Sequence, residues 1–143
     1  MLVKEAMSRE VKTVTPDQPL QDAARIMLDM DVGALPVAEN DKLVGMVTDR
    51  DIAVRGVAVG KSPTTAVREV MSKEVLYCYE DEDTAHVARN MAEQQVRRLP
   101  VVDRNKRLAG IVALADLATS ARSGQASAAL SGISQSGGAH SQH

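Results

Sequence analysis

The chain of 143 residues carries a formal net charge of −2, and 44% of its residues are hydrophobic, which suits one compact domain or two small half-domains. Aromatic residues make up 1% of the sequence and no basic stripe is present, so the composition argues against nucleic acid as a partner. No apolar run approaches the roughly 18 to 20 residues that cross a bilayer, and the N-terminus lacks the apolar core of a signal peptide, which predicts a cytoplasmic protein that does not bind membranes.

Both halves of the sequence predict the same order of elements, strand–helix–strand–strand–helix. In the first half we expect a short strand at residues 10–14, a helix at 20–30, strands at 34–38 and 43–48, and a helix beginning near residue 49. In the second half we expect a short strand at 74–79, a helix at 84–95, strands at 98–102 and 108–113, and a helix beginning near residue 114. Apolar stripes predict the buried helix faces: Ala23, Ala24, Met27 and Met30 in the first half, and Val87, Ala88 and Met91 in the second.

An internal repeat explains this agreement. The stretch from Met7 to Val37 matches the stretch from Met71 to Val101, and the shared residues include Met-Ser, Glu-Val, Ala-Arg and the final Leu-Pro-Val. One additional residue later in the second copy then changes the register. Agreement in both residue type and order indicates a duplicated structural unit.

The repeat also predicts how the chain is divided. We expect a first repeat at residues 1–60, a linker at 61–69, a second repeat at 70–122 and a disordered tail rich in Gly, Ser and Ala at 123–143. A unit of about 60 residues buries little surface on its own. The sequence therefore predicts an α+β fold in which two pseudo-symmetric repeats pack sheet to sheet.

One pair of polar residues differs between the copies. Thr48 and Asp51 have the spacing of a capping box at a helix N-terminus, with Thr48 as the N-cap. In the second copy Asp116 persists, but Ala113 stands where the threonine would be and cannot cap. A capping box alone therefore does not explain the aspartate in both copies.

Arginines mark a second difference. Arg97 and Arg98 stand at an apolar junction where the first copy has Gly33 and Ala34, so they need an anion, either an acidic neighbour or a ligand. Arg50 belongs to a charged turn that is either solvated or placed over a phosphate.

The stretches "GALPV", "GMVTDRDI" and "VRRLPV", in this tandem order, resemble the CBS domain, and two such domains in a row resemble a CBS pair, or Bateman module. The resemblance covers about residues 7–118. It implies a regulatory, ligand-sensing module that binds AMP, ADP, ATP or S-adenosylmethionine in clefts between the repeats. The chain is also similar to stand-alone bacterial CBS-pair proteins, which implies a role in a stress response.

The family pattern further implies which residues contact the nucleotide. Threonine and aspartate would meet phosphate or ribose, which a carboxylate, a hydroxyl and a helix N-terminus are suited to do. Arginines would meet phosphate, and residues around Leu-Pro-Val and the first strand would surround the base. The nucleotide-binding residues implied are Thr48, Arg50, Asp51, Thr13, Val14, Ala34, Leu35, Pro36, Arg97, Arg98, Pro100 and Asp116.

No catalytic residues, required cofactor or metal site are expected. Cys78 is expected in the core and His86 on the surface, and neither belongs to a nucleophilic or metal-binding set. With no catalytic domain recognisable in the sequence, the output of a sensor would pass through a homodimer or an unknown protein partner. The alternative is a ligand-free module for protein–protein interaction or dimerisation. Because the first copy keeps more polar groups, a sensor would bind nearer one nucleotide per chain than two.

Overall fold

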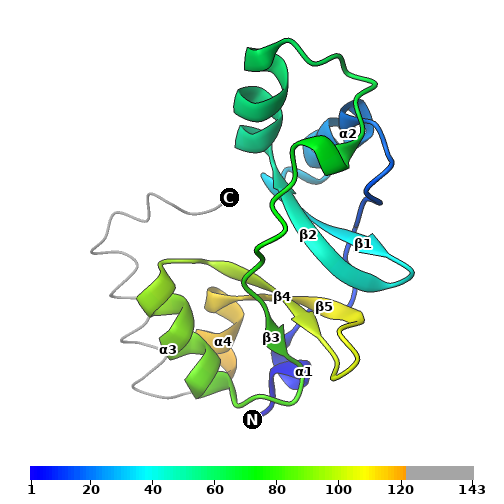
Figure 1. The fold of residues 1–143 in the computed structure, drawn as a ribbon. Coiled ribbons are helices and arrows are strands. Elements are labelled where there is room, and N and C mark those ends of the chain that lie inside the picture. The colour runs from blue at the N-terminus through cyan, green and yellow to red at the C-terminus, as the bar shows by residue number, and fades with distance from the viewer. Residues whose placement is uncertain (122–143) are drawn as a thin grey trace. The chain divides into compact units, whose positions relative to one another are not determined.

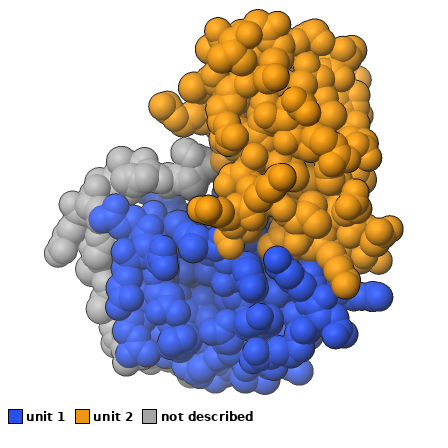
Figure 2. Space-filling view, viewed as in Figure 1, with its two compact units in different colours: residues 1–11, 76–142 blue, residues 12–75, 143 orange. Residues whose placement is uncertain are grey.

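The computed structural model describes residues 1–121, and the tail expected at 123–143 lies outside them. The described chain forms two compact units (Figures 1 and 2). Unit 1 contains Met1–Val11 together with the chain from Leu76 onward, and unit 2 contains Lys12–Val75. Each unit combines helices with a small sheet, so the predicted α+β class is confirmed.

Unit 2 is built around the antiparallel pair β1–β2, which runs from Ala34 opposite Thr48 to Glu39 opposite Lys42. Val14 adds a single parallel bridge to Val37. In chain order the elements are α2 (Leu20–Met30), β1 (Ala34–Glu39), β2 (Lys42–Thr48), the π-helix η1 (Asp51–Gly56), and the 3₁₀ helices η2 (Val57–Val59) and η3 (Val67–Glu69).

Unit 1 repeats this plan with a three-stranded sheet in the order β3-β4-β5. Strand β3 pairs with β4 in parallel, and β4 pairs with β5 antiparallel. Its elements are α1 (Val3–Ala6), β3 (Cys78–Tyr79), α3 (Thr84–Gln94), β4 (Arg98–Val102), β5 (Leu108–Ala113) and α4 (Leu114–Ala121).

Most predicted elements are confirmed to within one or two residues, and three differ. The first strand of each repeat is shorter than predicted, because only Val14 and the Cys78–Tyr79 pair find a neighbouring strand. The helix after β2 continues as a π-helix, whereas its counterpart α4 is a regular α-helix. In α2 the predictions for Ala24 and Met30 are wrong: both are exposed, because Leu20, Ala23 and Met27 form the buried stripe.

The segment that opens each repeat packs against the strands of the other repeat. Ser8 exchanges two backbone hydrogen bonds with Ile111 of β5, of 2.8 and 2.9 Å, and Ser72 exchanges two of 2.9 and 2.8 Å with Met46 of β2. Val3 is buried in the core of unit 1 and Val67 in that of unit 2. Each compact unit therefore combines most of one repeat with the opening segment of the other, and its bounds differ from the repeat boundaries expected from the sequence.

Two glycines allow these crossing segments to approach. A Cβ atom on Gly45 would lie 2.7 Å from the carbonyl oxygen of Ser72, and one on Gly110 would overlap the carbonyl oxygen of Ser8. Both glycines are buried in their strands. Gly45 and Gly110 therefore have to be glycine, because any side chain at these positions would collide with the backbone that passes over the strand.

Candidate functional site

The end of β2 and the following helix form a polar corner in unit 2. Asp51 N–H donates to Thr48 Oγ1 over 3.0 Å, and Thr48 N–H donates to Asp51 Oδ2 over 3.0 Å. This reciprocal pair confirms the capping box predicted from the sequence. The corner is closed from the other side, where Asp49 N–H donates to the carbonyl oxygen of Gly33 over 2.9 Å.

The capping box leaves part of each polar side chain available. An ionised carboxylate offers about four acceptor positions, and Asp51 uses one of them on Thr48. Its other oxygen, Oδ1, lies 3.8 Å from Nη1 of Arg55, and the Asp51 side chain is 19% exposed. The Thr48 hydroxyl accepts one bond and keeps its own proton to donate. Capping and ligand contact are therefore compatible at this corner.

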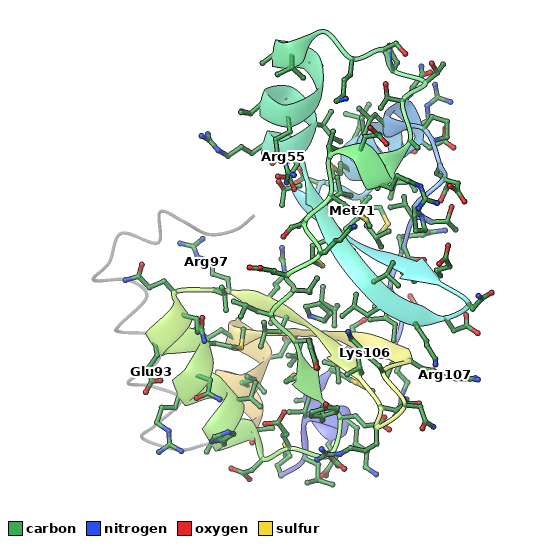
Figure 3. The ribbon with its side chains drawn as sticks, in the orientation of Figure 1. Arg55, Met71, Glu93, Arg97, Lys106 and Arg107 are labelled. Atoms are coloured by element: carbon green, nitrogen blue, oxygen red, sulfur yellow. The ribbon has the colours of Figure 1, made fainter. Side chains whose placement is uncertain are left out.

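Two arginines flank the corner. Arg55 projects from η1 (Figure 3). Arg50 is exposed and forms no side-chain ion pair or hydrogen bond within residues 1–121. Either guanidinium could meet a phosphate, although Arg55 already lies beside Asp51.

The remaining residues implied for the first copy lie along the same strands. Ala34 pairs with Thr48, and Val14 N–H donates to the carbonyl oxygen of Pro36 over 3.2 Å. Val14 and Leu35 are buried in the core of unit 2, so their side chains pack inward. Thr13 and Ala34 are half-buried, so they are the more accessible of the set.

The equivalent corner of unit 1 keeps the backbone geometry without the cap. Leu114 N–H donates to the carbonyl oxygen of Arg97 over 2.8 Å, as Asp49 does to Gly33 in unit 2. Asp116 is exposed, and its carboxylate makes no hydrogen bond or ion pair among the side chains that the structure describes. The aspartate is thus present in both corners but has a capping role in only one.

Arg97 and Arg98 are both exposed, and Figure 3 shows Arg97 extending from the chain between α3 and β4. Neither guanidinium forms an ion pair with a carboxylate of the described residues. Pro100, in the middle of β4, is buried. A bound anion remains the alternative that the sequence left open for the two arginines.

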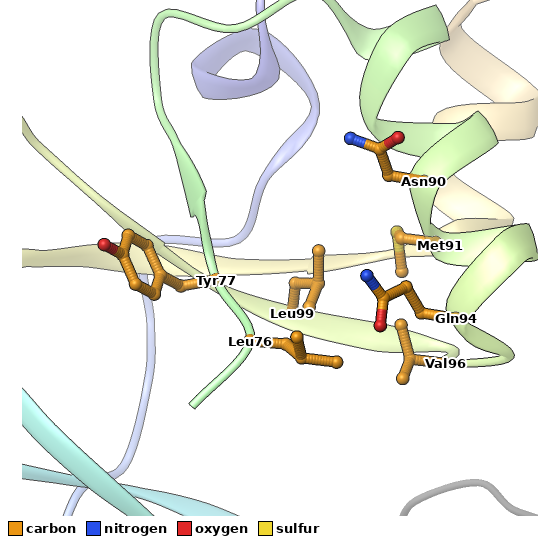
Figure 4. Close-up of a pocket in the computed structure, with 7 residues that line it drawn as sticks. All are labelled: Leu76, Tyr77, Asn90, Met91, Gln94, Val96 and Leu99. Atoms are coloured by element: carbon orange, nitrogen blue, oxygen red, sulfur yellow. The ribbon is translucent and has the colours of Figure 1, made fainter. Parts of the chain in front are cut away.

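Unit 1 also contains a small pocket of about 90 Å³ between α3 and the chain on either side of it (Figure 4). Its apolar lining consists of Leu76, Met91, Val96 and Leu99. Tyr77 and the carboxamides of Asn90 and Gln94 complete it. Small-molecule sites usually measure about 300–1,000 Å³, so this pocket is smaller than most such sites.

Next to the pocket, Tyr77 belongs to a cluster that also contains Tyr79 and Arg104. The rings of Tyr77 and Tyr79 meet edge to face with centroids 5.7 Å apart, and the Arg104 guanidinium lies 4.1 Å from the Tyr79 centroid. Arg104 also donates to both carboxylate oxygens of Asp81, over 3.0 and 2.7 Å. These hydrogen bonds hold the pKa of Asp81 below its ordinary value. The turn after β4 is thereby tied to β3.

The sequence did not predict the polar lining of this pocket. Asn90 aligns with Ile26 of the first repeat, and Gln94 aligns with Met30. Two carboxamides in place of two apolar residues on equivalent helices were the available signal. They were missed because the apolar stripe of α3, formed by Val87, Ala88 and Met91, accounted for its packing without them.

The other singled-out residues lie where the sequence predicted. Cys78 is buried, and burial raises the pKa of its thiol to about 12, so it is not a reactive thiolate. His86 is exposed, with Nε2 3.7 Å from Oε2 of Glu82. Within residues 1–121 no group of three or more His, Cys, Asp or Glu side chains is placed to hold a metal ion. No helix of the described chain is long and apolar enough to cross a bilayer.

Comparison with known proteins identifies the family. A model of the CBS domain matches residues 3–56 and 67–122, which is more than half of the chain. The chain therefore belongs to the CBS domain family and carries two copies in tandem. Among curated proteins it is 47% identical to the CBS domain-containing protein YhcV of Bacillus subtilis over 133 residues, 92% of this chain and 94% of that protein. It is 38% identical to Hypoxic response protein 1 of Mycobacterium tuberculosis over 117 residues, 80% of this chain and 81% of that one.

Solved CBS-pair structures share the fold, and some hold adenosine compounds. The CBS domain pair of protein MJ0100 in complex with 5'-methylthioadenosine and S-adenosyl-L-methionine has a TM-score of 0.69 and 32% identity, covering 83% of this chain and 98% of that chain. CBSX2 in complex with AMP has a TM-score of 0.74 and 26% identity, covering 85% and 96%. Hypoxic Response Protein I with two coordinated zinc ions has a TM-score of 0.73 and 36% identity, covering 83% and 98%.

Proposed function

We propose that this protein is a non-catalytic regulatory module that senses an adenosine-containing ligand, such as AMP, ADP, ATP or S-adenosylmethionine. The ligand would contact both repeats, so that binding favours one relative orientation of the two. The proposal is supported by membership of the CBS family and by the adenosine compounds bound to MJ0100 and CBSX2.

One observation in this chain carries the proposal. Asp51 and Asp116 occupy equivalent corners, but only Asp51 takes part in a capping box. Asp116 has no structural partner among the described side chains, so capping does not account for it. A ribose diol, which donates two hydrogen bonds to an ionised carboxylate, accounts for an aspartate at both corners.

The other implied residues take roles that fit their surroundings. The Thr48 hydroxyl and the amides at the start of the following helix would bind phosphate. Arg97 and Arg98 are exposed and have no ion-pair partner within the described chain, which suits them for the same phosphate groups. Arg50 is a weaker candidate on the unit 2 side.

We further propose that the signal leaves through association, either with a second copy or with another protein, and that the protein acts in the cytoplasm during a stress response. Exposed apolar side chains on the helices of unit 2 support an association surface: Leu28 is 80% exposed, Val57 68% and Val59 66%. The same surface would serve the alternative function, a dimerisation module that binds no ligand.

Isothermal titration calorimetry separates the two functions. Wild-type protein, the D51N and D116N variants, and R97Q/R98Q would each be titrated with AMP, ADP, ATP and S-adenosylmethionine. A sensor binds at least one of them, and D51N weakens that binding about tenfold or more, because a charge-assisted hydrogen bond is lost. The absence of heat with every ligand at millimolar concentration, together with a stable dimer in light scattering, would establish the ligand-free module instead.

The stoichiometry of the same titration tests the difference between the corners. If the first copy provides the better ribose and phosphate contacts, both variants lower the affinity, but D51N lowers it more than D116N does. Binding of close to one nucleotide per chain is then expected. Two equal sites, lost equally in the two variants, would contradict this asymmetry.

A further inference from the structure

The carboxylate of Asp51 and the guanidinium of Arg55 form a loose ion pair at the polar corner of unit 2. Oδ1 of Asp51 lies 3.8 Å from Nη1 of Arg55, beyond hydrogen-bond range, whereas Oδ2 accepts the N–H of Thr48. The Asp51 side chain is 19% exposed and the Arg55 side chain, which projects from η1 (Figure 3), is 52% exposed. The carboxylate is therefore held in place, while the guanidinium is free to turn towards a ligand.

A ligand at this corner meets both charges. A carboxylate that accepts hydrogen bonds from a ribose stays negative, so Asp51 by itself would repel a phosphate and attract a cation. Arg55 cancels that negative charge and adds N–H donors whose geometry matches phosphate oxygens. The arginine therefore reverses the charge preference that the aspartate alone would impose on the ligand.

The second copy has the aspartate without this cation. Ser120 aligns with Arg55 in the sequence. Asp116 is exposed, and its carboxylate makes no ion pair among the side chains that the structure describes. An ion pair as exposed as the one between Asp51 and Arg55 contributes little to stability. An arginine four residues after the aspartate thus belongs to the first copy only, and its main effect is on the charge that a ligand meets.

We propose that Arg55 sets the ligand preference of the Asp51 corner, which selects adenosine compounds with an anionic 5′ group over those with a cationic one. The adenine nucleotides carry a phosphate at the 5′ carbon, and the phosphate of AMP is close to doubly negative at neutral pH. S-adenosylmethionine carries a sulfonium cation at the same carbon, and 5'-methylthioadenosine carries a neutral thioether. This inference rests on the proposed function and narrows its ligand class at this corner to adenine nucleotides.

These compounds form a charge series that tests the proposal. Calorimetry at one fixed ionic strength, since salt screens exposed charges, would measure the affinities of AMP, ATP, 5'-methylthioadenosine and S-adenosylmethionine for wild type, R55Q and R55K. Wild type should bind a nucleotide most tightly and S-adenosylmethionine least tightly. In R55Q the ratio of nucleotide affinity to S-adenosylmethionine affinity should fall at least about tenfold, because the nucleotide loses a charge-assisted contact and the sulfonium loses a repulsion. R55K keeps the charge and should keep the order of the series.

K42Q is the matched control, because it removes the same charge from the other end of β2. Lys42 is exposed, and the seven-residue strand places it roughly 20 Å from Thr48. Its affinity ratio should equal that of wild type.

Four results would overturn the inference while ligand binding by wild type keeps the proposed function intact. They are an unchanged ratio in R55Q, an equal weakening of every compound in R55Q, the same fall of the ratio in K42Q, and a preference of wild type for S-adenosylmethionine. If wild type binds none of the four compounds, the proposed function itself fails, which is a distinct result.

Discussion

Replacing Gly110 with alanine tests the close approach of the N-terminal segment to β5 in unit 1. The new Cβ would overlap the Ser8 carbonyl oxygen and lie 3.0 Å from Sδ of Met7. The Ser8 backbone must therefore move, and it is held by hydrogen bonds of 2.8 and 2.9 Å to Ile111. The backbone cannot rotate away as a flexible side chain would, so the overlap has to be relieved by shifting or breaking these bonds.

The expected cost follows from these contacts. Overpacking costs about 1–3 kcal/mol and each weakened hydrogen bond about 1 kcal/mol. The lower entropy of the unfolded alanine chain offsets about 0.4–1 kcal/mol. We expect a net loss of about 2–3 kcal/mol, which lowers the melting temperature of a chain of this size by about 6–10 °C.

Thermal and urea unfolding, followed by circular dichroism, measure this loss. G45A should behave similarly, because Gly45 meets the Ser72 carbonyl oxygen in the same way. G33A is the matched control: its Cβ would lie 3.2 Å from Oδ2 of the exposed Asp49 side chain, which can move aside. A G110A variant as stable as G33A would refute the close approach.

Further measurements test other parts of the structure. V3A should lower the free energy of unfolding by about 2 kcal/mol, because Val3 is fully buried, and an unchanged urea midpoint would show that the N-terminal segment does not pack. T48A should cost about 1 kcal/mol through loss of the capping bond while T48S stays close to wild type, and equal midpoints for the two would contradict the cap. The thiol of Cys78 should react slowly with a disulfide reagent at about pH 8 in the folded protein and rapidly in urea. Its raised pKa, about 12, means that the folded state holds its proton longer than the unfolded state, so this contribution to stability should be lost as the pH rises from about 9 towards 12. The pKa of Asp81 is lowered by Arg104, so its contribution is present above the ordinary aspartate pKa and is lost as the pH falls through the lowered value; an NMR titration of R104Q should show the Asp81 pKa returning upward.

The order of helices and strands could be predicted because the sequence repeats the same pattern of apolar and polar residues in its two halves. Agreement between the copies placed α2 at Leu20–Met30 and β4 at Arg98–Val102 without error, since each apolar stripe or strand was supported by its counterpart. The Thr48–Asp51 bonds could be predicted for the same reason: their spacing is a local property of a helix start.

The packing of each repeat's opening segment against the strands of the other repeat could not be predicted in this way. The burial pattern shows that Val3 and Val67 need an apolar partner, but it does not show which unit provides it. The pocket was missed for a related reason. Its lining comes from Leu76, α3 and β4, and their approach depends on the tertiary fold rather than on sequence spacing.

The packing of each repeat's opening segment against the other repeat also sets an order for folding during synthesis. Unit 2 is one continuous stretch, Lys12–Val75, so all of its residues are synthesised before β4 is made. The first eleven residues must wait, because Ser8 pairs with Ile111 and Val3 belongs to a core cluster that includes Leu117. Domains generally fold as units during synthesis, and contacts between residues far apart in the sequence form slowly because a long loop must be closed. The N-terminal end of the chain is therefore among the first parts to be synthesised and among the last to reach its final place.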